Sequence, residues 1–191
     1  MPQVPSKVRN IASPPAQIAA LGAVLDIDFW RNTRRDWPAK DTAAVASYDG
    51  RGHRAGEPVP VYGANPRLAA DDEFLYAHPI YSGMEIRSTK LTGRLWIVDG
   101  TQEAVAATLE ATVAQLSDPQ DRSVCQRVTH ELFRQGAHAF KVRSARARTH
   151  GDVLIVERSA ARELLKEEEI VYRTIVNTDF GGVGGDWADR R

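Results

Sequence analysis

The apolar residues of this chain form short strand-like runs and longer helix-like stretches that follow one another in no regular order. Bulky and β-branched residues predict strands at 94–98, 140–142, 153–156 and 170–176. Apolar residues at three-to-four spacing predict helices at 101–116, 122–135 and 160–169. A doubly wound parallel sheet requires strict alternation of strands and helices, so the irregular order favours an α+β fold.

The N-terminal half of the chain is harder to interpret. Its pattern predicts a short amphipathic helix at 17–29 that leads into a strand or turn, and a second helix at 68–78. Between them, 32–57 is polar and glycine-rich, and the prolines at 58–62 are typical of a strand edge. Further along, Gly136 is predicted to end the helix at 122–135 in the left-handed conformation that glycine adopts easily.

Length and composition indicate one globular domain. The chain has 191 residues and is 42% hydrophobic and 26% charged, which excludes wholesale disorder. We expect an irregular N-terminal arm at 1–16, which contains four prolines, a single domain at 17–179 and a glycine-rich tail at 180–191.

Charge and cysteine content narrow the function classes. The 25 basic and 25 acidic residues cancel, which argues against a nucleic-acid binder or an anionic-membrane binder. The longest apolar run, 18–25, is far too short to span a bilayer, so we predict a cytoplasmic protein with no membrane partner. The single Cys125 excludes an internal disulfide and is expected to be a small buried side chain. His130 and His138 are expected to form a surface pair, and no metal site is predicted.

One stretch carries chemical information. Arg51 lies between two glycines, Tyr62 ends a short extended run, and Glu73 follows in the predicted helix at 68–78. An arginine fork suits pyrophosphate or carboxylate, and a tyrosine ring offers a flat face to another ring. A carboxylate can stabilise a cationic transition state or orient a hydroxyl. These three side chains can therefore converge on one cleft.

The same residues resemble the RES-domain toxin family. Tyr62 and Glu73 are eleven residues apart, as in the family pattern, and Leu75 and His78 follow. The segment 140–156 is similar to a family segment that consists of a serine-bearing strand, a loop and an apolar strand. Ser144 lies where the family has that serine. Upstream, Trp30 and Arg31 lie where the family has an aromatic-Arg pair. Gly52 and His53 depart from the pattern, because the family has Trp and Asn there.

The resemblance implies an ADP-ribosyltransferase-like fold, with a split, mostly antiparallel sheet core and flanking helices. It implies an enzyme that consumes NAD as its substrate, by hydrolysis, by phosphorolysis or by ADP-ribose transfer to a protein. It also implies a toxin restrained by a cognate antitoxin protein. Catalytic roles would fall to Glu73, Arg31 and Ser144, and NAD binding to Arg51, Tyr62 and Arg54. Arg34 and Arg35 compete with Arg31, as Arg54 does with Arg51.

Two other classes of function remain open at this point. The arm at 1–16 and the tail at 180–191 are typical of segments that order on a partner, which would suit a non-enzymatic subunit of a larger assembly such as a virion or a secretion machine. Arg143, Arg146 and Arg148 could contact nucleic acid, although a solvated strand face that also includes Lys141 is the commoner explanation. Homo-oligomerisation also stays open.

Overall fold

The computed structural model describes residues 19–34, 52, 59–64, 85–118, 120–144 and 151–175, and the side chains within these ranges except at 32–34, 85–88 and 169–175. The expected arm at 1–16, the helix at 68–78 and the tail at 180–191 therefore lie outside the described residues. What is described contains the predicted mixture of a sheet core and flanking helices.

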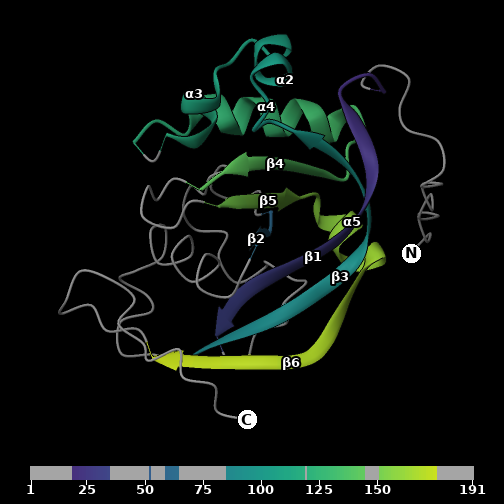
Figure 1. The fold of residues 1–191 in the computed structure, drawn as a ribbon, viewed down its shortest axis with the longest axis vertical. Coiled ribbons are helices and arrows are strands. Elements are labelled where there is room, and N and C mark those ends of the chain that lie inside the picture. Colours follow the sequence, from purple (N-terminus) through teal and green to yellow (C-terminus); the bar gives the residue numbers. More distant parts are fainter. Residues whose placement is uncertain are drawn as a thin grey trace, which may run out of the picture.

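Strands and helices follow one another in mixed order (Figure 1). The strands are β1 (Gly22–Arg34), β2 (Val61–Gly63), β3 (Glu85–Asp99), β4 (Ala139–Arg143), β5 (Asp152–Val156) and β6 (Leu165–Ile175). The helices are α2 (Glu103–Thr108), α3 (Val113–Ser117), α4 (Ser123–Arg134) and α5 (Arg158–Leu164).

The sheet closes on itself. Its strand order is β1-β2-β5-β4-β3-β6, and β1 also pairs with β3 along its whole length. The strands β1, β2, β5, β4 and β3 therefore form a ring, and β6 extends from the first half of β3. All these pairings are antiparallel except that between β3 and β4, whose parallel crossover carries α2, α3 and α4.

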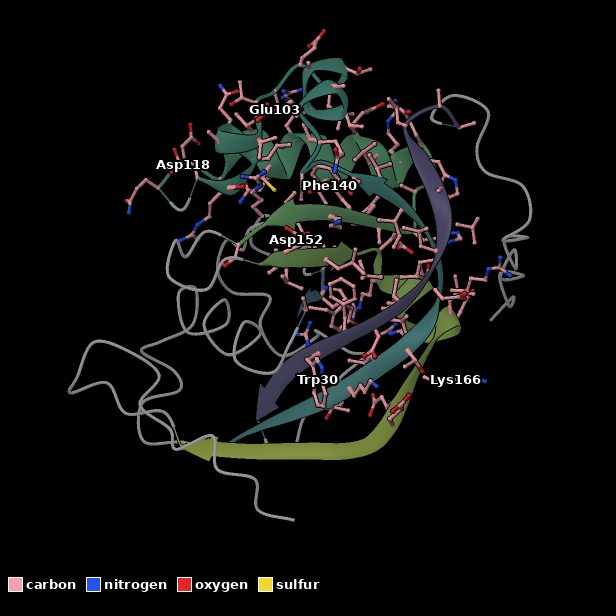
Figure 2. All side chains as sticks on the ribbon, in the orientation of Figure 1. Trp30, Glu103, Asp118, Phe140, Asp152 and Lys166 are labelled. Atoms are coloured by element: carbon pink, nitrogen blue, oxygen red, sulfur yellow. The ribbon has the colours of Figure 1, made fainter. Side chains whose placement is uncertain are left out.

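Two apolar clusters fill the two faces of the sheet. On one face, Phe140 and Val142 of β4 pack with Leu116 and Leu132 beneath the helices α2 to α4 (Figures 1 and 2). The alternate residue Ala139 belongs to the other cluster, which lies against α5. That second cluster includes Ile27, Tyr62, Leu91, Leu95, Leu154 and Leu165. Period-two alternation along the strands thus separates the face covered by α2, α3 and α4, which we call the helix-covered face, from the face that carries Tyr62.

The predicted helix at 17–29 is wrong, because β1 occupies Gly22–Arg34. Leu21, Val24 and Leu25 have helical spacing, but the long pairing with β3 overrides this local preference. Gly22 fits that pairing closely, since a Cβ there would lie 2.4 Å from the Ile97 carbonyl oxygen. Long-range strand pairing, absent from any local pattern, therefore decides this segment.

Two further helices differ from their predicted lengths. The stretch 101–116 forms two helices, because Glu110 adopts a positive φ of 55° and Thr112 starts α3 with a capping box to Gln115. The predicted helix at 160–169 ends at Leu164, and the strand expected at 170–176 begins at Leu165. Leu165 is 2% exposed and pairs with Gly93, so tertiary packing ends the helix early.

The end of α4 before β4 follows the prediction. α4 ends at Arg134, and Gly136 has a φ of 100°, as a left-handed stop requires. Cys125 is buried within α4, as expected.

His138 is not on the surface: it is 6% exposed, and its Nδ1 accepts a hydrogen bond from the Trp96 N–H. The predicted surface pair of histidines is therefore wrong. Among the described helices, none is long and apolar enough to cross a bilayer.

Candidate active site

Arg31 and Tyr62 meet where β1 and β2 touch. The two strands are antiparallel and pair at Trp30 and Gly63. Arg31, which follows Trp30, therefore lies beside Tyr62, which precedes Gly63. The Arg31 guanidinium carbon lies 5.5 Å from the centroid of the Tyr62 ring, a cation–π distance. Arg31 is 3% exposed and Tyr62 is fully buried. Two residues far apart in the sequence thus form one buried pair.

The Tyr62 phenol is a permanent hydrogen-bond donor at neutral pH. Burial raises its pKa, the Arg31 charge lowers it, and the Glu167 charge raises it, with a net shift well above the ordinary value. Within the described residues, the buried hydroxyl makes no hydrogen bond. A buried donor of this kind is costly unless a further group accepts from it. It is therefore available to a ligand or to a segment outside the described residues.

Ser144 lies just beyond the end of β4. Its backbone N–H donates to the Gly151 carbonyl oxygen over 2.9 Å, which closes the β4–β5 hairpin at this edge. Strand β5 pairs with both β2 and β4, and Leu154 is opposite Tyr62 on one side and Lys141 on the other. Strands β2 and β4 are both antiparallel to β5, so both of them end near the start of β5. Ser144, which follows β4, therefore lies at the same end of the sheet as the end of β2, just after Tyr62.

A charged cluster lies on the sheet face that carries Tyr62. We call Lys141, Asp99 and Asp152 the Lys141 cluster. The Lys141 Nζ lies 3.0 Å from Asp99 Oδ2 and 3.2 Å from Asp152 Oδ2. Asp99 also accepts hydrogen bonds from the Thr101 N–H and hydroxyl, at 3.1 and 2.6 Å. Asp152 lies at the start of β5 (Figure 2).

Asp99 and Lys141 both favour their charged forms. Burial raises the pKa of Asp99, but hydrogen bonds from Thr101 and Lys141 outweigh it and the net pKa is lowered. Burial lowers the pKa of Lys141, but Asp99 and Asp152 outweigh it and the net pKa is raised. Lys141 is thus ion-paired and half-buried, unlike the solvated strand face that the basic pattern predicts, whereas Arg143 is exposed.

The structure places only part of the predicted site. Arg31 and Tyr62 are in contact, and Ser144 lies at the same end of the sheet. The other predicted site residues, Glu73, Arg51 and Arg54, lie outside the described residues, as does Arg35, and the side chain of Arg34 is not described. The sequence pattern placed Lys141 on a solvated strand face and did not predict its ion pairs with Asp99 and Asp152.

Gly52 explains one departure from the family pattern. It is buried, and a Cβ at this position would lie 2.5 Å from Ile155 Cγ2 and 3.2 Å from Val59 Cγ2. A tryptophan at residue 52 would therefore require Ile155 to change.

The described residues contain no second candidate site among their acidic, histidine and cysteine side chains or at their hollow. Among the described residues, no group of three or more His, Cys, Asp or Glu side chains could hold a metal ion. A hollow of about 250 Å³ lies between α4 and the end of α2, lined by residues such as Leu109, Arg127 and Leu132. It belongs to the helix-covered face, away from Tyr62.

Comparison with known proteins identifies the family. The RES domain model matches residues 28–174, which is most of the chain, so this protein belongs to the RES domain family. Among solved structures, a chain in the crystal structure of the M. tuberculosis MbcT–MbcA toxin–antitoxin complex has a similar fold. The TM-score is 0.63 at 16% identity, covering 82% of this chain and 89% of that one. A search of curated proteins found no match.

Proposed function

We propose that this protein is an NAD-consuming toxin that cleaves the bond between nicotinamide and ribose. Three observations support the proposal: membership of the RES domain family, a fold similar to a chain of a toxin–antitoxin complex, and a buried arginine–tyrosine pair. The Arg31–Tyr62 contact carries the proposal furthest, because a guanidinium beside an aromatic ring can bind the phosphate and the ring of a dinucleotide together.

The proposed reaction breaks the bond between ribose C1′ and the nicotinamide nitrogen. Both electrons of the bond leave with nicotinamide, which becomes neutral, and C1′ acquires oxocarbenium character. Water, a phosphate oxygen or a protein side chain then adds to C1′, and an attacking water loses a proton. A carboxylate beside the ribose stabilises the positive charge at C1′.

Each proposed role follows from side-chain chemistry. Glu73 would supply the carboxylate, and Arg31, Arg51 and Arg54 would hold the pyrophosphate or ribose hydroxyls. Tyr62 would pack on the nicotinamide or ribose and donate its buried hydroxyl. Ser144 would orient the nicotinamide ribose by hydrogen bonding.

The finer fold assignment belongs to the same proposal. An ADP-ribosyltransferase-like fold splits its sheet around an NAD cleft. In support, β3 pairs with β4 near its end and with β6 over its first half, so its partners diverge along its length. The cleft would open on the face that carries Tyr62.

We also propose a cognate antitoxin protein as partner and the cytoplasm as the place of action. The similar fold in a toxin–antitoxin complex supports the first part. The second follows from the substrate, since an enzyme that depletes NAD must act where the cell keeps it. An antitoxin that covers the Tyr62 face would block access to Arg31.

The direct test incubates purified protein with NAD, with and without phosphate, and analyses the products. We expect free nicotinamide when phosphate is present, and without phosphate only if water or a protein side chain is the acceptor. The partner product is ADP-ribose for hydrolysis, a phosphorylated ADP-ribose for phosphorolysis, or a modified protein for transfer. If NAD remains intact and expression does not harm a host cell, the proposal is wrong.

The matched variants are Glu73→Gln and Glu163→Gln. The first should abolish nicotinamide release by about 100-fold or more, since it removes the stabilising charge. The second changes an exposed residue of α5 and should release nicotinamide at the wild-type rate. Circular dichroism of both variants should match that of the wild type.

A further inference from the structure

We propose that Lys141 is a positioning residue of this site, which acts through Asp99 and Asp152 to hold Ser144 in place. The inference rests on the proposed function, because Ser144 matters through its role in binding NAD. The geometry of the Lys141 cluster and of the short strands that it joins supports this role.

The cluster ties three strands together. Lys141 comes from β4, Asp99 ends β3 and Asp152 starts β5, so each ion pair crosses a different strand boundary. The side chains are 26%, 32% and 35% exposed, respectively, which shields them partly from water and salt. The Thr101 hydrogen bonds fix the Asp99 carboxylate on the side away from Lys141.

The strand pairing at this point is short. β4 pairs with β3 at Ala139, Phe140 and Lys141, and the last pair is Lys141 with Asp99. Beyond it, only the pairing with β5 continues to Arg143, opposite Asp152. The Ser144 N–H bond to Gly151 follows directly. Lys141 therefore braces the last point at which β4 has neighbours on both sides.

Direct phosphate binding by Lys141 is the competing interpretation. The cluster contains one ammonium and two carboxylates within 3.2 Å, so its net charge is 1 − 2 = −1. A net negative cluster repels a pyrophosphate. The charge balance therefore favours a bracing role over a phosphate contact.

The test compares Lys141→Met, Lys141→Arg and Asp152→Ala with a matched control, Lys90→Met. Lys90 also bridges two carboxylates, with Nζ 3.0 Å from Asp28 and 3.8 Å from Glu168, and its side chain is 22% exposed. Steady-state kinetics would give kcat and KM for NAD. Amide hydrogen exchange, followed by NMR, would report on the Ser144 N–H without any need for activity.

We expect Lys141→Met and Asp152→Ala to lower kcat by about tenfold to 100-fold through misplacement of Ser144. Both should speed exchange of the Ser144 amide by about tenfold or more, since the hairpin edge opens more often. Lys141→Arg keeps the charge and should restore most of the kcat. Lys90→Met should change neither measurement.

Several results would overturn the inference. If Lys141 binds phosphate, Lys141→Met raises KM while Asp152→Ala lowers KM and leaves kcat unchanged. Unaltered Ser144 exchange in Asp152→Ala, which retains the Lys141–Asp99 pair and so the best chance of folding, also contradicts it. If wild-type protein does not consume NAD, the proposed function fails, while the exchange measurement still decides whether Lys141 braces Ser144.

Discussion

The pairing of Arg31 with Tyr62 places a charge and a phenol where burial makes both expensive. A guanidinium that is 3% exposed needs compensation, and the electron-rich face of the Tyr62 ring supplies part of it. A buried hydroxyl without a hydrogen bond from the described residues is a further cost. Such costs are common at functional sites, where stability is traded for a prepared binding surface.

Tyr62→Phe tests this trade directly. Removal of the buried hydroxyl should leave the free energy of unfolding unchanged or raise it by about 1 kcal/mol. The same change should slow nicotinamide release if, as proposed, this hydroxyl donates to the substrate. Urea denaturation and product analysis would measure the two effects. A destabilisation above about 1 kcal/mol would instead indicate that the hydroxyl bonds to a residue outside the described part of the chain.

The backbone conformation of Glu110 leads to a second prediction at the scale of single residues. It has a φ of 55° at the end of α2, and its N–H bonds to the Ala107 carbonyl while the Ala111 N–H bonds to that of Ala106. This is a Schellman ending, in which glycine is the preferred residue. Glu110→Gly should therefore raise the free energy of unfolding by about 0.5–1 kcal/mol.

The control for that prediction is the same replacement within the helix. Ala107 is exposed and helical, so Ala107→Gly should lower the free energy of unfolding by about 1 kcal/mol. Opposite signs in urea denaturation would support the interpretation of Glu110. Destabilisation by both variants would contradict it.

At the scale of elements, local signals predicted the structure wherever they were strong. The apolar face of α4 and its Gly136 stop, and the β-branched run of β5, all appear as expected. β1 could not be predicted, because its conformation comes from pairing with β3, more than fifty positions later in the chain. The early end of α5 likewise depends on a tertiary contact, between Leu165 and Gly93.

The Lys141 cluster predicts a dependence of stability on pH. The folded-state pKa of Asp99 is lowered, so its contribution is present above the ordinary carboxyl pKa and is lost as pH falls through the folded value. The raised pKa of Lys141 has the opposite sense: its contribution is present below 10.5 and is lost as pH rises through the folded value. The cluster should stabilise the fold between these limits.

Urea denaturation of wild type and Lys141→Met across pH would check this dependence. The difference in their free energies of unfolding should be constant near neutral pH and should narrow below about pH 4, as Asp99 takes up a proton. Lys90→Met provides the reference, since the Lys90 pKa is also raised by its hydrogen bond to Asp28. A difference for Lys141→Met that stays constant to pH 3 would contradict the prediction.

At the scale of the whole molecule, the ring of strands sets the order of local stabilities. The segments 95–98, 139–142 and 153–156 have apolar clusters on both faces, whereas α2 and α3 cover only one. Amides in these strands should exchange only through global unfolding. Amides of α2 and α3 should exchange at least about tenfold faster through local opening. Exchange mass spectrometry measures both, and equal protection in the two groups would contradict the prediction.

The candidate site is only partly readable at this scale. The resemblance named Arg31, Tyr62 and Ser144 as separate residues. The β1–β2 register brings Arg31 beside Tyr62, and the pairing of β5 with β2 and β4 puts Ser144 at the same end of the sheet. Strand register depends on pairing between distant segments, which a single sequence does not fix. The ion pair of Lys141 with Asp99 could not be predicted for the same reason, since Asp99 is 42 positions away in the chain.

The crossover from β3 to β4 gathers α2, α3 and α4 on the side opposite Tyr62 (Figure 1). The exposed turn around Gln120, between α3 and α4, is therefore the natural attachment point for a tether or a reporter. A molecule anchored to a sensor chip through this turn would leave the opposite face of the sheet unobstructed, so that binding of the proposed antitoxin to that face could be measured.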